Sequence, residues 1–422
     1  MKSFMIILIL FLGLPMFSMD SATSMSFSDS YLMRATGTDC IYWNPSNFTL
    51  EGNYDKCQIE IAPFNLSFAL FNNMISIHRY NSINGDSLSY NDKKGLLDDL
   101  KGSINFGASV SSKIFAIAMK NWGISIGFNS MAKMKISEKV LDLILFGNDE
   151  DEAYDLSQEN NYGLSYFDIT VAGSKYYLDD YLKFLQDCNI PKIRVGGGIS
   201  FLIGMAYGEF SKFDTILEST IDSGTNLDAD LTLRQGVGGF GIKGQITFSS
   251  VLSEKLSMGL KIDQILGFIK WTGNTKETEY HVTADSVYLS DLDEKFYVNE
   301  DTTRAIDDFS SRLPINLHLG TLYKLNEKIS FSLDWLQGFE KSVTTSYNPD
   351  ISLGIEYLIK PSFPIRTGFK FGTSEHPYKT SFGTGYYGKN FEVIISIQTY
   401  KHIVPCSYSQ GIAYGFTTRY NF

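Results

Sequence analysis

The closing segment GFTTRYNF constrains the fold of this chain most, because it alternates two kinds of side chain without interruption. One side of this segment and the residues just before it carries Ile412, Tyr414, Phe416, Thr418, Tyr420 and Phe422, and the other carries Ala413, Gly415, Thr417, Arg419 and Asn421. A two-residue period predicts a strand with one apolar face and one small or polar face. Two environments suit such a strand: a soluble β-sheet with one buried face, or a membrane barrel with lipid outside and water inside.

The same alternation recurs along most of the sequence, in runs that are long for a soluble protein. KISFSLDWL places Ile329, Phe331, Leu333 and Trp335 on one face and Lys328, Ser330, Ser332 and Asp334 on the other. The runs cover roughly 10 to 16 residues, whereas globular strands average about 5 or 6 and a tilted bilayer-crossing strand needs about 9 to 11. Strand length therefore favours a membrane barrel.

The spacing of the runs predicts the number of strands and their connections. We expect strands near 58–72, 103–119, 123–137, 163–177, 192–210, 237–250, 255–271, 313–325, 328–339, 349–360, 364–373, 379–388, 390–400 and 410–422. Tight turns alternate with longer segments, the longest being about 73–102, 138–162, 211–236 and 272–312. Outer-membrane barrels have short periplasmic turns and longer outside loops, and their closure leaves no strand edge unpaired in hydrocarbon.

The sequence thus predicts an all-β fold, a transmembrane antiparallel β-barrel of about 14 strands (12–16). An even count would place both termini on the periplasmic side. YLDDYLKFLQDC, near 177–188, falls on the short-turn side but has a helical pattern, so we expect either a small periplasmic helix or a miscount there. An exported soluble β-sandwich is the alternative, but it does not explain strand length, loop rhythm and the terminal Phe422 together.

The first residues have the layout of a secretory signal peptide. Lys2 precedes an apolar stretch at 4–17, and small residues follow at 18–22. The apolar stretch is short for a spanning helix and no positively charged flank follows it, which disfavours the alternative of an N-terminal membrane anchor. No later segment approaches about 18 uninterrupted apolar residues. We therefore expect a signal peptide at 1–22 and export.

Charge and the scarcity of catalytic side chains argue against several function classes. The formal net charge of -11 provides no basic face for nucleic acid. The sequence has five histidines and no Ser–His–acid spacing, so we expect neither an enzyme nor a cofactor. His318 lies in mid-strand on the polar face, where we expect a lumen residue with a hydrogen-bond partner.

The cysteines and the acidic runs do not predict a metal site. The cysteines are Cys40, Cys57, Cys188 and Cys406. Export permits disulfides, and Cys40 with Cys57 could close a small loop, but the pairing stays open. The acidic runs at 147–155 and 290–301 lack the fixed spacing of a calcium loop, so we expect solvated outside loops there.

The polar face of the later strands leaves space inside the barrel. Gly, Ser, Ala and Thr dominate it, with cations interspersed at Lys192, Arg194, Lys243, Lys261, Arg366 and Lys370. GVGGFGIKG, at 236–244, alternates its glycines within a strand, so we do not expect a phosphate-binding loop. Small inward side chains leave room for a plug or a ligand. We predict that 23–57, which carries Tyr31, Tyr42, Trp43 and Phe48, fills this room as a plug, and that 58–422 forms the barrel.

Two stretches resemble known outer-membrane proteins. The ending, with Tyr420 and Phe422, resembles the C-terminal strand that the bacterial barrel-assembly machinery recognises. MRATGTDCIYWNPSNFTLEG resembles the opening of FadL-like outer-membrane proteins, a superfamily that includes hydrocarbon transporters and PorV-type secretion proteins. In that superfamily an Asn-Pro-Ala motif follows an aromatic residue. Tyr42, Trp43, Asn44 and Pro45 match the motif, with Ser46 in place of alanine.

The resemblance implies the outer membrane of a Gram-negative bacterium and a lipid environment. It implies either a FadL-like passive channel for a small hydrophobic ligand, with Tyr42, Trp43, Asn44 and Pro45 shaping the plug, or a PorV-like barrel that hands over exported proteins. A mainly structural barrel is a third alternative. The sequence does not separate the first two, because they share the fold and the N-terminal motif.

Overall fold

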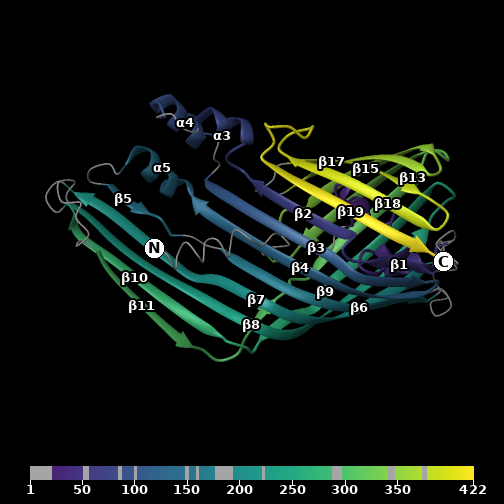
Figure 1. Cartoon of the computed structure of the whole chain (residues 1–422), viewed down its shortest axis with the longest axis horizontal. Helices are drawn as coiled ribbons and strands as arrows, with labels where there is room; N and C mark the ends of the chain where they lie inside the picture. Colours follow the sequence, from purple (N-terminus) through teal and green to yellow (C-terminus); the bar gives the residue numbers. More distant parts are fainter. Residues whose placement is uncertain are drawn as a thin grey trace.

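The computed structural model describes residues 21–50, 57–83, 88–98, 102–147, 152–157, 161–175, 193–220, 224–287, 297–340, 347–372 and 378–422. Within these ranges the chain forms one antiparallel sheet that closes on itself as a barrel (Figure 1). The predicted helix near 177–188 and residues 1–20 of the predicted signal peptide (1–22) lie outside the described residues.

The sheet contains 19 strand segments. The first nine are β1 (Gln58–Ile61), β2 (Asn65–Asn72), β3 (Ser103–Met119), β4 (Trp122–Ser137), β5 (Glu152–Asp155), β6 (Tyr162–Lys175), β7 (Ile193–Thr220), β8 (Gly224–Val251) and β9 (Leu256–Trp271). The others are β10 (Lys276–Val287), β11 (Tyr297–Ala305), β12 (Phe309–Arg312), β13 (Asn316–Lys324), β14 (Ile329–Gly338), β15 (Asp350–Lys360), β16 (Phe363–Phe371), β17 (Tyr378–Tyr387), β18 (Phe391–Tyr400) and β19 (Gly411–Asn421).

Some of the 19 segments belong together in groups, and each group makes up one strand of the barrel wall. β1 and β2 both lie between β3 and β19, β5 continues β6 beside β7, and β10 continues β9 beside β8. β12 and β13 both pair with β9, and β11 precedes them beside β10. Counted in this way the barrel has 14 strands, closed where β19 pairs with β1 and β2. The predicted all-β barrel and its strand count are confirmed.

Two of the predicted long loops are wrong. Segment 211–236 continues β7 and β8 to a tight turn in which Thr220 lies opposite Gly224, and segment 272–312 contains β10, β11 and β12. Residues 152–155 and 297–301 of the two acidic runs are likewise strand residues, in β5 and β11. These segments are largely polar on both faces, so the apolar period that marks a wall strand is missing.

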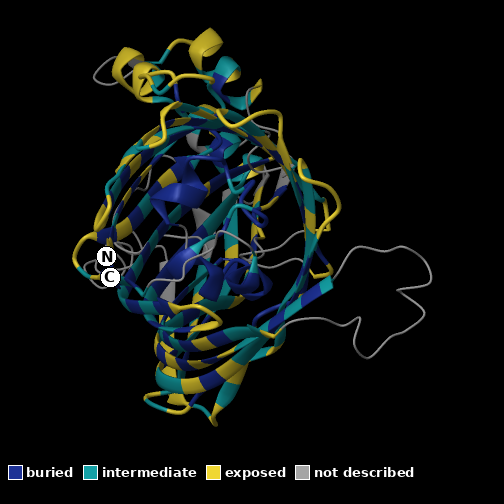
Figure 2. Cartoon of the chain, turned by 90° about the vertical axis from the view of Figure 1, so that its right-hand side faces the viewer, coloured by how far each residue is buried: buried dark blue, intermediate teal, exposed yellow. Residues whose placement is uncertain are grey.

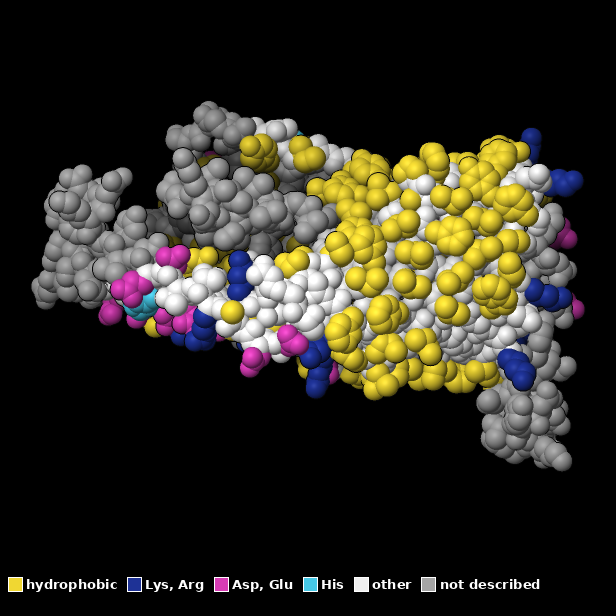
Figure 3. Space-filling view, turned by 60° about the horizontal axis from the view of Figure 1, so that its bottom comes forward, with side chains coloured by type: hydrophobic (Ala, Val, Ile, Leu, Met, Phe, Trp, Pro, Cys, Tyr) yellow, Lys and Arg dark blue, Asp and Glu magenta, His cyan; other side chains and the backbone are white. Residues whose placement is uncertain are grey.

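Together these segments form a sheet that projects beyond one end of the barrel, which we call the outer sheet (Figure 1). The outer sheet consists of β5, residues 210–220 of β7, residues 224–235 of β8, β10 and β11. Its surface carries charged side chains, whereas the barrel beside it is covered by hydrophobic ones (Figure 3).

The outward face of the barrel is an apolar band of the kind that contacts lipid in outer-membrane barrels. Its exposed aliphatic side chains include Leu66, Val171, Ile199, Ile203, Leu319, Leu333, Leu353, Ile365 and Ile395. Exposed aromatic side chains gather near the tight turns: Trp122, Tyr323, Tyr357, Phe363, Tyr386, Phe391 and Tyr420. Such an aromatic girdle marks a membrane–water interface.

The terminal strand has the predicted two faces. Tyr414 and Tyr420 are exposed on the outside, whereas Thr417 and Arg419 are buried on the inside. Phe422 lies at the end of the barrel that carries the tight turns (Figure 1). Recognition of Tyr420 and Phe422 by the assembly machinery remains a prediction.

Three helices lie at the opposite rim: α3 (Ile77–Ile83), α4 (Tyr90–Asp98) and α5 (Glu138–Phe146). Leu96 and Leu141 pack with Met74 and Ile104 in a small core that joins these helices to β3. Among the described residues, no helix has the length and apolar character needed to cross a membrane.

The N-terminal segment, residues 21–50, lies inside the ring of strands (Figure 2). It contains α2 (Ala22–Met25) and the short 3-10 helices η1 (Gly37–Ile41) and η2 (Pro45–Thr49). Nearly all of its side chains are buried, polar ones included. Its contacts with the wall define the candidate site.

Candidate functional site

Inward-facing glycines allow the N-terminal segment to run close against the wall. A Cβ atom at Gly368 of β16 would overlap the backbone of Phe27, and one at Gly196 of β7 would lie 2.5 Å from the carbonyl carbon of Pro45. Further wall glycines face the segment in the same way: Gly123, Gly259, Gly320, Gly354, Gly383 and Gly415. The small lumen residues seen in the sequence therefore make space for this segment.

Tyr42 and Trp43 extend across the lumen in different directions. The Tyr42 hydroxyl lies 2.8 Å from the Ser125 hydroxyl and 3.0 Å from a carboxylate oxygen of Asp168, which joins it to β4 and β6. The Trp43 ring makes edge-to-face contacts with Tyr31, at 5.4 Å between centroids, and with His318, at 5.8 Å. The two aromatics therefore contact different parts of the barrel wall, Tyr42 at β4 and β6 and Trp43 at β13.

Asn44 and Pro45 fix the turn that follows. The Asn44 amide donates to the Leu32 carbonyl at 3.2 Å and its oxygen accepts from the Ser46 hydroxyl at 2.6 Å. Pro45 is the first residue of η2, where a proline loses no helical hydrogen bond. The structure places all four motif residues inside the barrel; their role in closing it remains a prediction.

A buried cluster of charges fastens the segment to the place where the barrel closes. Asp39 of η1 is bonded to Lys113 of β3, at 2.5 Å, and to Arg419 of β19. Arg419 also contacts Glu60 of β1 at 2.8 Å and Glu392 of β18 at 3.5 Å. All five side chains are almost inaccessible to solvent. We call them the charge cluster.

The charge cluster keeps Asp39 ionised. Burial alone would raise the pKa of the Asp39 carboxyl, but the neighbouring Arg419 and Lys113 cations outweigh it and hold that pKa below its usual value. The Tyr31 hydroxyl donates to the same carboxylate at 2.8 Å. The Asp39 carboxylate thus has two cations and a hydroxyl beside it, and it shares the cations with Glu60 and Glu392.

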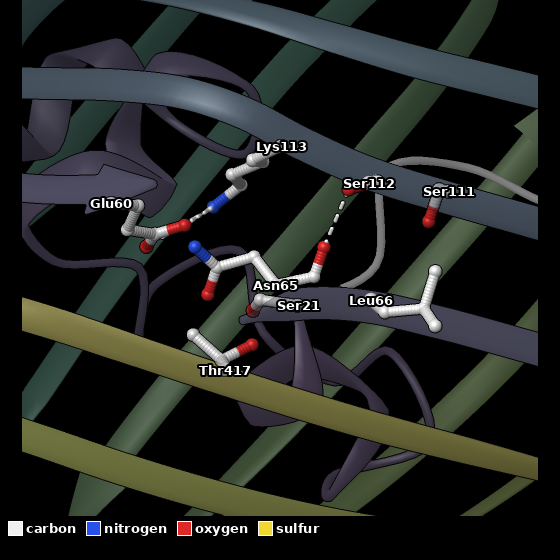
Figure 4. A pocket seen from close by; sticks show the side chains of 8 residues that line it. All are labelled: Ser21, Glu60, Asn65, Leu66, Ser111, Ser112, Lys113 and Thr417. Carbon is white, nitrogen blue, oxygen red and sulfur yellow. Dashed lines mark hydrogen bonds and ion pairs between the residues drawn. The ribbon is translucent and has the colours of Figure 1, made fainter. Parts of the chain in front are cut away.

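A small cavity of about 10 Å³ adjoins the charge cluster (Figure 4). Glu60 and Lys113 point toward each other across it, and the Ser112 hydroxyl donates to the Asn65 carbonyl oxygen at 2.7 Å. A volume of about 10–15 Å³ holds one water molecule. This cavity belongs to the fastening of the segment and cannot hold a transported molecule.

A second attachment point is Asp334 of β14, which accepts hydrogen bonds from the segment backbone. The Tyr31 and Leu32 amides donate to one carboxylate oxygen at 3.0 and 2.9 Å, and His318 of β13 contacts the same oxygen at 2.9 Å. The prediction that His318 is a lumen residue with a hydrogen-bond partner is confirmed.

A larger cavity, of about 160 Å³, lies between the N-terminal segment and the wall. Its apolar lining consists of Tyr42, Trp43, Met131, Tyr166 and Leu336. Its charged lining consists of Asp29, Lys243, Lys261, Asp263, His318, Asp334, Asp350 and Lys370. The cavity therefore has an apolar part and a strongly polar part.

The wall is irregular beside this cavity. The ladder between β8 and β9 shifts on either side of Gly244. On the other side of β9, pairing stops at Asp263 and resumes at Phe268, and Gln264 and Leu266 within this gap have positive φ values of 58° and 52°. Because Gly244, Asp263 and Gln264 line the cavity, its wall includes the interrupted part of the sheet.

Two further groups were candidates for metal or redox chemistry. Cys40, Cys57 and Cys406 are free, so the small Cys40–Cys57 loop is not closed, and Cys188 lies outside the described residues. Asp228, Asp230 and His281 of the outer sheet come within 4.8 Å of one another. Asp230 is already bonded to His281 and to Lys212, each at 2.8 Å. The prediction of no metal site remains a prediction.

Comparison with known proteins shows which known structures have a similar fold. The sequence matches no described protein family and no curated protein. The toluene transporter TbuX of Ralstonia pickettii is similar over 97% of this chain and 100% of its own, with 11% identity and a TM-score of 0.51. The toluene transporter TodX of P. putida is similar over 94% and 96%, with 10% identity and a TM-score of 0.48. A Pseudomonas aeruginosa FadL homologue is similar over 96% and 99%, with 12% identity and a TM-score of 0.47.

The closed sheet and its apolar outer face define a transmembrane β-barrel. The likeness to TbuX over 97% of this chain shows the same barrel fold, which is the fold that the FadL-like resemblance implies. The resemblance seen in the N-terminal motif is thus confirmed at the level of fold.

Proposed function

We propose that the protein is a passive FadL-like channel for small hydrophobic molecules in the outer membrane, closed at rest by residues 23–57, with both termini in the periplasm. The observation that carries this proposal is the position of the larger cavity. It is bounded on one side by Tyr42 and Trp43 of the N-terminal segment and on the other by the interrupted ladder of β9. A molecule in this cavity is thus next to an interrupted part of the wall.

The position of the cavity suggests the route of a transported molecule. A molecule enters from the end that carries the outer sheet, occupies the cavity, and leaves sideways through the wall at 264–267. On the side of β12 and β13, residues 264–267 of β9 form no ladder pairs among the described residues, and one backbone hydrogen bond crosses there, from the Leu313 amide to the Gly267 carbonyl. Opening this side therefore breaks fewer hydrogen bonds than parting two fully paired strands. Toluene transport by TbuX, which shares the fold, supports a hydrophobic cargo.

The test uses the motif residues that shape the segment. Replacing Asn44 and Pro45 together by alanine removes the Leu32 and Ser46 hydrogen bonds and the fixed start of η2. We expect uptake of a hydrophobic fluorescent probe to change at least several-fold while the protein still assembles as a heat-modifiable barrel. Unchanged uptake would count against the closing role of the segment.

A PorV-like barrel that binds exported proteins is the alternative. The feature that favours it is the outer sheet, whose strand β11 lies at an edge and pairs with β10 alone among the described strands. Co-purification of one specific protein, together with no flux of any small probe, would favour this alternative over the channel.

A further inference from the structure

The larger cavity contains hydrogen-bond acceptors that no group in the described residues uses. Four oxygens are buried without a donor: Asp29 Oδ1, Gln245 Oε1, Gln264 Oε1 and Asp350 Oδ1. All four residues line this cavity. A buried acceptor without a donor is unfavourable, so these oxygens favour a ligand that brings one.

The orientation of the Gln245 amide is set by the N-terminal segment. Its nitrogen donates to the Ile41 carbonyl at 2.6 Å, so its oxygen is the atom left for a ligand. The side chain is only 7% exposed. Gln264 belongs to the irregular stretch of the adjoining strand, where Gly244 lies opposite Ile265. Two amide oxygens therefore belong to the part of the cavity beside the interrupted wall.

The two carboxylates of the cavity share one lysine. Lys370 contacts Asp29 at 3.1 Å and Asp350 at 2.9 Å, through the Oδ2 atom of each. Lys379 contacts the same Asp29 atom at 2.7 Å. The Oδ1 atoms are the ones without a donor, so each carboxylate keeps one acceptor for a ligand.

The cations of the cavity are already neutralised. Lys261 contacts Asp263 at 2.7 Å and donates to the Tyr42 carbonyl at 2.6 Å, and Lys243 lies 3.9 Å from Asp168. Lys370 is held between two aspartates as described above. Each of these lysines has a carboxylate within 4.0 Å, so an anionic group would bring a further negative charge beside the aspartates, whereas a donor group would meet acceptors without a donor.

The remaining lining sets the size and shape of the ligand. Trp43, Tyr166, Met131 and Leu336 provide an apolar surface. The cavity volume of about 160 Å³ is close to that of apolar cavities that hold one benzene ring, about 150 Å³. The size and the apolar side chains fit a single aromatic ring.

We propose that this cavity selects single-ring aromatic molecules that carry a hydrogen-bond donor, either a hydroxyl group or a protonated amine. The inference rests on the proposed channel function and narrows its cargo from hydrophobic molecules in general to this class. The ring contacts the apolar side chains, and the donor binds the amide or carboxylate oxygens.

The test is isothermal titration of the full-length mature protein in detergent with four probes of similar size. These are ethylbenzene, 2-phenylethanol, 2-phenylethylamine and phenylacetate. We expect the alcohol or the amine, or both, to bind at least tenfold more tightly than ethylbenzene, and phenylacetate to bind most weakly. Equal affinity for ethylbenzene and both donors, tightest binding of phenylacetate, or no binding of any probe would overturn the proposal.

Three variants distinguish a hydroxyl site from an amine site. Gln264→Met removes an amide acceptor at similar size, and we expect a loss of at least fivefold for the alcohol with no change for ethylbenzene. Asp350→Asn removes a negative charge, and we expect the larger loss for the amine. Leu336→Val is the matched control, because it trims the apolar lining and should weaken all ring probes alike. Equal losses for ethylbenzene and the donors in Gln264→Met and Asp350→Asn would contradict the assignment.

Flux measurements distinguish the proposed cargo class from the proposed channel function. Flux of hydrophobic probes without any preference for donors would leave the channel standing and overturn the cargo class. Donor-selective binding without flux would support the cavity assignment and count against the channel. A heat-modifiable barrel in every variant is the folding control.

Discussion

Asp39 of the N-terminal segment and Arg419 of the last strand form an ion pair in which both side chains are fully buried. Two residues that are 380 positions apart in the sequence are thus joined at the place where β19 closes the barrel against β1. The same Asp39 carboxylate also holds Lys113 of β3. Because Arg419 belongs to the last strand, the N-terminal segment can make these ion pairs only when the barrel is complete.

Replacing Asp39 by asparagine should release the N-terminal segment. The change breaks the buried ion pairs that join the segment to Lys113 and Arg419, which costs up to about 3–5 kcal/mol, while Glu60 and Glu392 of the wall still pair with both cations. We expect trypsin to cleave after Arg34 in this variant and not in the unchanged protein. Asp214→Asn is the control, because Asp214 pairs with Lys212 on the exposed outer sheet. Equal resistance of both variants to trypsin would refute the fastening role of Asp39.

The charge cluster also predicts the pH dependence of the closed state. The pKa of Asp39 lies below the usual value of about 3.9, so its ion pairs contribute stability at every pH above that value and lose it as the pH falls further. Conductance to small ions in planar bilayers should therefore stay constant from about pH 8 to pH 5 and rise below about pH 4. A rise near neutral pH would point to a different titrating group.

A side chain at Gly368 should displace the segment from the wall. A Cβ atom there would overlap the backbone of Phe27, and overpacking of this kind costs about 1–3 kcal/mol or more. Gly368→Leu should thus increase the permeability of cells to a large polar dye. Gly244→Ala is the control, since its Cβ would lie 3.5 Å or more from its neighbours. If the Gly368→Leu variant is no more permeable to the dye than the control, the segment is not held against the wall at Gly368.

A disulfide across β9 and β13 should block the sideways route. Asp263 and Asn316 are directly opposite each other at the last pair before the ladder is interrupted. With the native cysteines changed to serine, Asp263→Cys with Asn316→Cys should lose most hydrophobic flux when oxidised and regain it when reduced. The reduced protein is its own control. Full flux through the oxidised protein would mean that the route lies elsewhere.

The fold could be predicted from the sequence because the wall strands obey one simple rule. Outward residues such as Leu333 are apolar and inward ones such as Ser332 are small or polar, so the two-residue period reveals them. The outer sheet was not predicted because β10 and β11 carry polar side chains on both faces and so have no such period. Long segments between wall strands therefore look like loops whether or not they pair.

The site was only partly predictable. The aromatic and Asn-Pro residues of the segment were visible, and so were lumen cations such as Lys261. Arg419 was also visible as a charge on the polar face of the terminal strand, whereas Lys113 was not among the predicted lumen cations. Asp39 was not predicted as their partner either, because the path of the irregular segment has no period to read. The left-handed backbone at Gln264 and Leu266 gave no sequence signal either, since neither residue is a glycine.

The most direct test of the central claim is flux through the purified protein in liposomes. A hydrophobic fluorescent probe and a polar sugar of similar size would be followed side by side, with the unchanged protein and with a variant that lacks 23–57. The proposed channel should pass the hydrophobic probe and retain the sugar, and the deletion should abolish this selectivity by letting both through. Passage of neither probe through an intact, heat-modifiable barrel, before and after the deletion, would contradict the channel.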